Sequence, residues 1–422
     1  MSTGKLVSSE GLNSLQKALE TIISDAPYTA AASVLAEKLK VSGLVLSERE
    51  QASLAAHLKS GSKKKFSLDR ETGANRAIEV SITPEDLAEI EKKVDRFSAA
   101  MPELIENQTN FAANLILKSL KKRWPKEQRL QRKETKEFRD RLSLRWAPSL
   151  GTLQMILTMA REVGANVRRQ TSSKSFAHST HLIDVQTRLH ARACQVTDEI
   201  LCLLQSGFSE GALARWRTLH EIAVVSDVIL EGGEEIAKRY VVHHSIETLR
   251  AAEEYQRLHR RLGFKPISVS KMRTISEDAA KAKALYGKAF SSQYGWAADL
   301  LNMQRPTFVD LEKRANSDQY RSHYKWASEG VHAGSKGIFK PEPRIGRHKV
   351  MLAGPSNGGL ADPGHATALS LGRITANAAS LNPIFDMDVS IKMLRVLIDE
   401  AGRQFLACHR ELMKDERLHP NG

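Results

Sequence analysis

Residues 206–240 read SGFSEGALARWRTLHEIAVVSDVILEGGEEIAKRY, and this stretch indicates a helical fold. Gly207 can close a preceding helix, and Ser209 is a favourable residue at the start of the next one. The glycine pair at residues 232–233 is expected to stop that helix after Leu230. Between these signals, apolar residues recur at the spacing of an amphipathic helix.

The same helix carries ionisable residues on its apolar face. At about 100° per residue, Arg217 and Glu221 fall on one stripe with apolar residues, and His220 lies beside Arg217. An arginine and a glutamate four residues apart inside such a stripe are expected to form an ion pair, because an unpaired buried charge is unfavourable.

A second polar face is predicted downstream. Residues 319–333 favour a helix on which Tyr324, Ser328 and His332 are four residues apart and therefore share one face. Two helices thus place polar residues where apolar ones are expected. If the two faces meet, the predicted catalytic set is Arg217, His220, Glu221, Tyr324, Ser328 and His332. The alternative is that these residues only fix helix packing.

Helical signals extend over most of the chain, so the sequence predicts an all-α fold. We expect a multi-helix bundle domain at residues 182–415, preceded by a basic helical region at residues 1–175. The boundary is placed in the polar connector at residues 168–180, RRQTSSKSFAHST. Residues 346–366 combine a strand-like HKVML with Gly- and Pro-rich turns, which favours a small hairpin or flap within the bundle domain.

The charge balance points to a polyanionic partner. The chain has 63 Lys and Arg against 49 Asp and Glu, a net charge of +14. Residues 118–145 hold 12 basic and 4 acidic residues, so 12 − 4 = +8 of that excess lies in one predicted helix. Its basic face could follow a phosphate backbone, with RNA favoured, or could simply be solvated. The residues expected to bind nucleic acid are Lys121, Lys122, Arg123, Arg129, Arg132, Lys133 and Arg139.

Several other classes of protein are disfavoured. The three cysteines have neither metal-ligand spacing nor the even number of a disulfide framework, and His178 and His181 have no evident third ligand. Phosphate-loop, dinucleotide and serine-elbow motifs are absent, so neither a metal nor a cofactor is expected. No signal peptide and no apolar run of membrane-spanning length is found, which predicts a cytoplasmic protein without a membrane partner.

Three segments together resemble the domain-of-unknown-function 5677 family over about residues 185–410. They are EILCLLQSGFSEGALARWRTLHEIAVVSDVIL, AKRYVVHHSIETL and YRSHYKWASEGVHAGSKG. The family's features are an Arg-x-x-x-Glu helix, a Ser-x-x-x-His ending and a Gly-Pro-rich segment. They correspond here to Arg217 with Glu221, Ser328 with His332, and Gly354-Pro355-Ser356. The resemblance implies an all-helical fold and a candidate site, but no reaction.

A looser resemblance is to HEPN-type helical proteins, many of which are metal-independent ribonucleases of toxin and phage-defence systems. Their signature, Arg followed after four to six residues by His, is matched by Arg215 and His220. The sequence departs from the pattern because Trp216 follows the arginine in place of a polar residue.

Two functions follow from these observations. The first is a nucleic-acid-directed effector, a metal-independent endoribonuclease of a toxin or anti-phage defence type. The second is a non-enzymatic nucleic-acid-binding or sensing module in which the Arg–Glu and Ser–His positions are structural. A small-ligand pocket under the Gly-Pro-rich segment is a third, weaker reading. Partner proteins stay open, and a homodimer is compatible with either function.

Overall fold

A computed structural model describes residues 9–62, 65–67, 80–171, 180–332, 334–339 and 353–418 of the chain. These residues are almost entirely helical and include no strand, so the predicted all-α class is confirmed. The chain forms two compact units, residues 1–135 and 136–422. Within the described residues, none of the helices is both long and apolar enough to cross a membrane.

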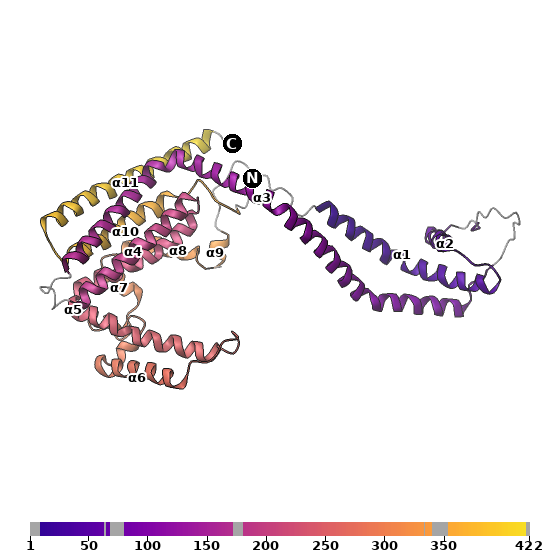
Figure 1. Cartoon of the computed structure of the whole chain (residues 1–422), viewed down its shortest axis with the longest axis horizontal. Helices are drawn as coiled ribbons and strands as arrows, with labels where there is room; N and C mark the ends of the chain where they lie inside the picture. Colours follow the sequence, from indigo (N-terminus) through magenta and orange to yellow (C-terminus); the bar gives the residue numbers. More distant parts are fainter. Residues whose placement is uncertain are drawn as a thin grey trace. The chain divides into compact units, whose positions relative to one another are not determined.

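The N-terminal unit contains α1 (Ser9–Val41), α2 (Glu48–Ser60) and the first part of α3 (Pro84–Thr171). Ser47 and Glu50 form a reciprocal capping box at the start of α2, and Gly61 ends it in the left-handed region with φ 60°. α1 lies along α3 (Figure 1), where Lys38 contacts Asp86 at 2.5 Å. The small apolar core of this unit lies mainly between α1 and α2.

The division between the units falls inside α3 and not at the connector of residues 168–180. α3 continues through Pro102, Pro125 and Pro148, where the sequence predicts separate shorter helices. Its last part belongs to the C-terminal unit because Leu142, Trp146 and later apolar residues are buried in the core of that unit. Residues 172–179 of the connector lie outside the described residues.

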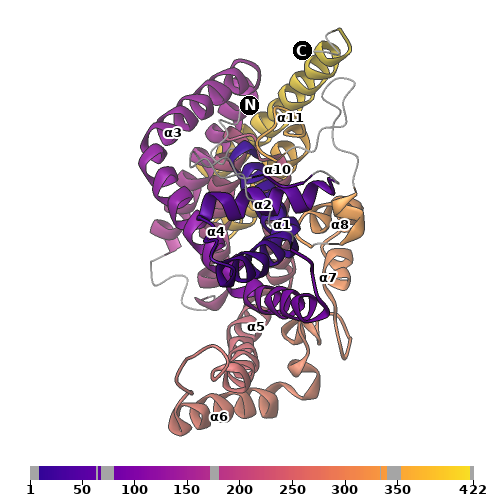
Figure 2. The same ribbon diagram turned by 90° about the vertical axis from the view of Figure 1, so that its right-hand side faces the viewer.

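The core of the C-terminal unit forms where α3 packs with α4 (Thr180–Gln205), α5 (Ser209–Leu258), α10 (Ala361–Ala379) and α11 (Phe385–Leu418) (Figures 1 and 2). The largest side chains at its centre are Trp146, Trp216 and Phe405, all buried. Both indoles also find hydrogen-bond acceptors, as buried tryptophans require. Trp146 Nε1 donates to the side-chain oxygen of Asn357 at 2.8 Å, and Trp216 Nε1 donates to the Ala366 carbonyl at 3.0 Å.

The glycine pair interrupts α5, as the sequence predicts. Gly233 has the non-helical values φ 65° and ψ −153°, and a second helical part continues beyond this kink to Leu258. The second half of α5 and α6 (Val269–Tyr286) form a helical hairpin that extends away from the five-helix core (Figures 1 and 2). A second apolar core lies between this hairpin, the first half of α5, α7 (Phe308–Arg314) and α8 (Arg321–Glu329). Short helical turns complete the connections at Lys288–Ser291, Gly295–Ala297, Asp318–Tyr320 and Ser335–Ile338.

The Gly-Pro-rich segment is described only in part. The strand-like residues 348–352 lie outside the described residues, so the predicted hairpin stays a prediction. Residues 353–360 form bends that dock on the turn between α4 and α5, where the Ser356 amide donates to the Gly207 carbonyl at 2.9 Å. Together with the Trp146–Asn357 bond, this contact fixes the described part of the segment to the core.

Replacement of two helical glycines by alanine should change the free energy of unfolding in opposite directions. A Cβ at Gly364 in α10 would overlap the buried ring of Phe405, whereas a Cβ at Gly151 in α3 would meet open space. We expect Gly364→Ala to lower the free energy of unfolding by about 1–3 kcal/mol through overpacking. Gly151→Ala should raise it by about 0.5–1 kcal/mol, because alanine is the better helix former. Urea unfolding of both variants and the parent would measure this, and two equal shifts would contradict the packing described here.

Candidate functional site

The polar residues predicted on α5 and α8 meet on one side of the second core. Arg217 Nε donates to Glu221 Oε1 at 3.2 Å, one turn apart on α5. The Tyr324 hydroxyl of α8 donates to the same carboxylate oxygen at 2.5 Å. The Arg217 guanidinium also lies 4.7 Å from the centroid of the Tyr324 ring, in cation–π geometry. The structure therefore brings Arg217, Glu221 and Tyr324 together.

This group lies at the edge of the core and not deep inside it. The Arg217 side chain is 27% exposed and that of Glu221 is 37% exposed, while Tyr324 is buried. Burial and the Glu221 carboxylate both raise the pKa of the Tyr324 hydroxyl, so it is a hydrogen-bond donor at neutral pH. Solvent can reach the guanidinium from one side, and the ion pair contributes less to stability than a buried pair would.

A deeper group lies beneath it, centred on a glutamate that the sequence did not single out. Glu312 of α7 has no exposed surface, and its two carboxylate oxygens contact different partners. His220 Nε2 donates to Oε1 at 3.0 Å, and an Arg321 nitrogen donates to Oε2 at 2.8 Å. The Arg321 guanidinium also lies 5.1 Å from the Tyr324 centroid, on the same ring that Arg217 contacts. Glu312 thus connects α5, α7 and α8.

A sequence signal for Glu312 does exist. On α7, Phe308 and Leu311 mark the apolar face, and Glu312 occupies the same face four residues after Phe308. A charged residue at such a position predicts a buried partner. That partner could not be chosen from the sequence, because His220 is 92 residues away along the chain.

His220 is enclosed, although it belongs to the predicted catalytic set. It is 3% exposed and is surrounded by the rings of Trp216, Phe308, Tyr320 and Tyr324, with centroids 5.3–6.0 Å away. Burial lowers the pKa of His220, and the opposing effect of Glu312 does not outweigh it. A neutral imidazole that donates its Nε2 proton to Glu312 satisfies this geometry. His220 therefore serves as a fixed hydrogen-bond donor in the interior.

Ser328 and His332 do not join the two groups. The Ser328 hydroxyl donates to the Tyr324 carbonyl at 2.8 Å, within its own helix. α8 ends at Glu329, so His332 follows the helix and is exposed to solvent. Within the described part of the chain, no hydrogen bond or ion pair connects His332 to Arg217 or Glu221.

A further ion pair, partly buried, connects the same helices to α10. Arg373 of α10 contacts Asp227 of α5 at 2.5 Å and also donates to the Ala315 carbonyl and the Ser317 hydroxyl. Asn377 donates to the other oxygen of Asp227 at 2.6 Å. These contacts hold the end of α7 against α5 and α10, so the polar groups around Glu312 rest on a fixed frame.

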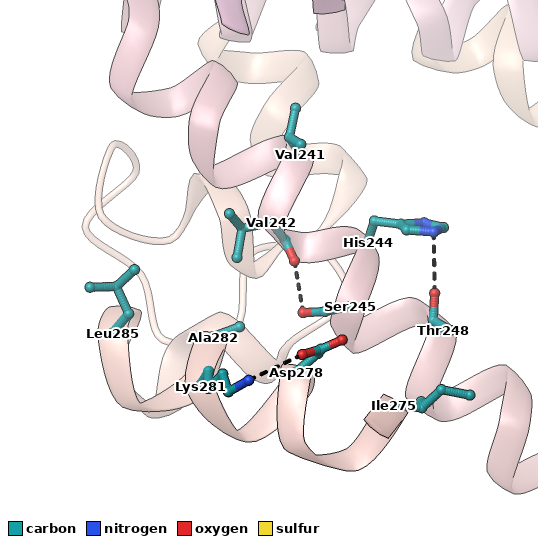
Figure 3. A pocket seen from close by; sticks show the side chains of 10 residues that line it. All are labelled: Val241, Val242, His244, Ser245, Thr248, Ile275, Asp278, Lys281, Ala282 and Leu285. Carbon is teal, nitrogen blue, oxygen red and sulfur yellow. Dashed lines mark hydrogen bonds and ion pairs between the residues drawn. The ribbon is translucent and has the colours of Figure 1, made fainter. Parts of the chain in front are cut away.

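The structure also contains a groove away from these groups. It lies between the second half of α5 and α6 and encloses about 540 Å³ (Figure 3). His244 and Thr248 hydrogen-bond to each other on one wall, and Asp278 and Lys281 form an ion pair on the other. None of the six predicted catalytic residues lines this groove.

The predicted nucleic-acid-binding residues lie on the exposed surface of α3. All seven are exposed: Lys121, Lys122, Arg123, Arg129, Arg132, Lys133 and Arg139. Trp124, beside them, is 40% exposed. Arg139 donates to the Ser206 hydroxyl at 2.9 Å, and Arg129 Nε donates to the Pro125 carbonyl at 3.3 Å. These contacts leave most of each guanidinium accessible, because a guanidinium has five donor hydrogens.

Among the described residues, no group of three His, Cys, Asp or Glu side chains lies close enough together to hold a metal ion. His178 lies outside them. His181 forms an ion-pair contact with Glu234 at 2.6 Å, and Glu234 also accepts hydrogen bonds from the His181 and Leu182 amides. That pair caps the start of α4.

The fold and these groups define an all-α protein whose C-terminal unit binds its helices together through a buried polar cluster. Residues 184–341 match the model of the Family of unknown function (DUF5677). The match includes Arg217, Glu221, Glu312, Tyr324 and His332, and it ends before the Gly-Pro-rich segment. No curated protein and no solved structure matches the chain. The resemblance to HEPN-type proteins stays a prediction.

The buried His220 should make stability depend on pH. Its pKa is lower in the folded protein than the value of about 6.5 in the unfolded chain. Below that pH the unfolded state therefore binds a proton that the folded state does not, and stability falls as the pH decreases toward the folded pKa. His220→Gln should retain the bond to Glu312 and lose less stability on acidification than the parent.

The matched control for this measurement is His323→Gln, which changes an exposed histidine on α8. Urea unfolding between pH 7 and pH 5, a range of about two pH units around the histidine value, would measure the effect. An unchanged pH dependence in His220→Gln would show that His220 does not resist protonation in the folded state.

Proposed function

We propose that this protein is a nucleic-acid-binding module that uses the basic surface of α3 and whose Arg–Glu and His–Glu groups are structural. The observation that carries the proposal is the exposure of all seven predicted basic residues along one continuous helix. A helix rises about 1.5 Å per residue, so residues 121–133 of the N-terminal unit extend over about 18 Å. That length allows contacts to several successive phosphates.

The charge distribution supports a polyanion in preference to a protein partner. Residues 118–145 carry a net charge of +8, whereas the whole chain carries +14. Acidic residues in the stretch lie one turn from basic ones, as in the Lys136–Asp140 contact at 2.7 Å, but there are too few of them to neutralise it. Lysine and arginine side chains contact phosphates without reading the base sequence, so sequence-independent binding is the expected mode.

The polar cluster supports a structural role for its deeper members. Glu312 has both oxygens satisfied by His220 and Arg321, and the imidazole is enclosed by aromatic rings. A general acid or base must reach the substrate proton directly or through one water. His220 does not meet that requirement in this geometry.

Reversing four basic residues of α3 should weaken nucleic-acid binding. The test variant has Lys121, Lys122, Arg129 and Arg132 changed to Glu. We expect its slope of log affinity against log salt concentration to become less steep by about 3. The reason is that each lost phosphate contact means about one counterion fewer released on binding. Fluorescence anisotropy with a single-stranded RNA and a DNA duplex over a salt series would measure the slope for both.

The control must carry the same change in net charge. Lys238, Lys283, Lys288 and Lys313 are exposed lysines of the C-terminal unit, and their reversal to Glu provides that match. If both variants lose affinity equally, only net charge matters and the α3 surface is not the binding site. If neither changes, nucleic acid is not the partner.

A metal-independent ribonuclease of a toxin or anti-phage defence type is the second candidate. It is favoured by one observation: the guanidiniums of Arg217 and Arg321 both contact the ring of Tyr324, and both side chains are partly exposed. Two guanidiniums so placed could clamp a phosphate and stabilise the charge that develops on cleavage. The exposed His332 would then have to supply the proton transfer.

The enzymatic candidate makes a sharp prediction about His332. His332→Ala should abolish cleavage of a single-stranded RNA in the presence of a chelator and leave the melting temperature unchanged, because the side chain is exposed. His323→Ala, at another exposed histidine of the same region, should cleave normally. A parent protein that does not cleave RNA, or a His332→Ala variant that still does, would remove this candidate and leave the binding module.

A further inference from the structure

Positive charge in the C-terminal unit is concentrated at the turn between α5 and α6. Residues 255–276, called here the hairpin tip, contain six basic residues and no acidic one. The basic residues are Arg257, Arg260, Arg261, Lys265, Lys271 and Arg273. Together with the +8 of residues 118–145, this +6 accounts for the whole net charge of +14. The tip is therefore one of two places where the chain attracts a polyanionic partner.

Most of these cations have no carboxylate partner. Arg257 contacts Glu254 at 2.6 Å on α5. Arg273 lies 3.8 Å from Glu277 on α6. The other four are exposed and form no ion pair within the described part of the chain: Arg260, Arg261, Lys265 and Lys271. Their charge is free to interact with a ligand.

The same tip exposes large apolar side chains. Leu262 is 55% exposed, Phe264 is 62% exposed and Val269 is 87% exposed. They fill no core, because none of the residues between Ala252 and Ala279 is buried. Three further apolar residues of the tip are half-buried: Leu258, Ile267 and Met272. Exposed apolar groups gathered among charged residues mark an interaction surface.

A hydrogen-bonded turn carries these exposed side chains. The Phe264 amide donates to the His259 carbonyl at 2.9 Å, and Gly263 before it has φ 71°, the left-handed conformation that commonly ends a helix. The Tyr255 hydroxyl donates to the Lys265 carbonyl at 2.9 Å and holds the turn to α5. The exposure of Phe264 is thus a property of a defined turn.

We propose that the hairpin tip docks on a membrane surface that contains anionic lipid. Exposed cations beside exposed apolar groups match such a surface, because the cations attract the anionic headgroups while the apolar groups enter the boundary with the acyl chains. The tip is the free end of a hairpin that projects from the core of its unit (Figures 1 and 2). The sequence prediction of no membrane partner rests on the lack of a spanning segment and a signal peptide, and peripheral docking requires neither.

The aliphatic residues favour lipid over the other polyanions. Phosphate backbones are contacted by cationic and polar side chains, and unpaired bases stack on aromatic rings or guanidiniums. Leu262 and Val269 serve neither contact. Apolar wedges do enter kinked DNA, so nucleic acid is an outcome that the test includes. A folded protein partner would need a concave acidic surface shaped to the tip, whereas a bilayer accepts a projecting apolar group without a matching shape.

Binding of the full chain to lipid vesicles tests the proposal. We expect it to bind vesicles of equimolar phosphatidylserine and phosphatidylcholine at least about tenfold more tightly than vesicles of phosphatidylcholine alone. Phe264→Ser should weaken binding to the anionic vesicles roughly tenfold, because an apolar contact is lost. Leu285→Ser is the matched control, since Leu285 is 67% exposed at the other end of α6. It should bind like the parent, and circular dichroism would confirm that both variants keep their helices.

Charge reversal separates the tip from the basic surface of α3. Arg261→Glu with Lys265→Glu should weaken binding to the anionic vesicles by roughly a hundredfold, since two attractive charges become repulsive. Lys238→Glu with Lys283→Glu carries the same change in net charge at exposed lysines outside the tip and should lose much less. The variant with four α3 residues changed to Glu should keep most of its vesicle binding, and the tip variant most of its RNA binding. The two proposals therefore fail independently.

A fluorophore at the tip reports contact with lipid directly. Phe264→Cys in a Cys202→Ser background leaves only buried native cysteines, Cys194 and Cys408. A nitrobenzoxadiazole label at residue 264 should brighten when the anionic vesicles are added, because its surroundings become apolar. The same label at Leu285→Cys should not change.

A parent chain that binds neither kind of vesicle would overturn the proposal. So would equal losses in the tip variants and their controls, or a loss of vesicle binding in the α3 variant as large as that at the tip. If the tip variants lose RNA binding and keep vesicle binding, the tip is a nucleic-acid contact. If they instead lower the sedimentation coefficient of the protein alone, the tip binds a second copy of the chain, and the lipid proposal is wrong in either case.

Discussion

A carboxylate without exposed surface constrains the C-terminal unit. The buried charge of Glu312 is tolerable only with close partners, and these come from two other helices: His220 from α5 and Arg321 from the start of α8. Both oxygens are used, so the three helices have little freedom to shift. The group of Arg217, Glu221 and Tyr324 at the edge of the core depends on the same positions of the helices, because it lies on the same α5–α8 contact.

The contact with the buried Glu312 carboxylate gives neighbouring residues of α5 different environments. His220 and Glu221 are neighbours in sequence, yet one is enclosed by aromatic rings and the other reaches the surface. Arg217 and Arg321 contact one tyrosine ring from two helices. Arg217 and Glu221 are therefore the part of the cluster that a ligand could reach, whereas Glu312 and His220 stabilise the fold.

α3 combines several surfaces on one element. Its start lies along α1, its middle carries the basic residues, and its last part is core of the C-terminal unit. Helix propensity alone does not stabilise such a length, because most helical stability in proteins comes from packing. Residues from Leu142 onward contribute to a core, whereas the exposed basic residues are proposed to contact nucleic acid.

The sequence by itself determined the helical class, the pairing of Arg217 with Glu221 within one turn, and the concentration of charge in residues 118–145, because each depends on spacing within a single helix. Only the tertiary structure decided that Glu312 is the partner of His220 and that His332 lies apart from the cluster. Those outcomes depend on contacts between residues tens of positions apart. Local propensity is too weak to decide either.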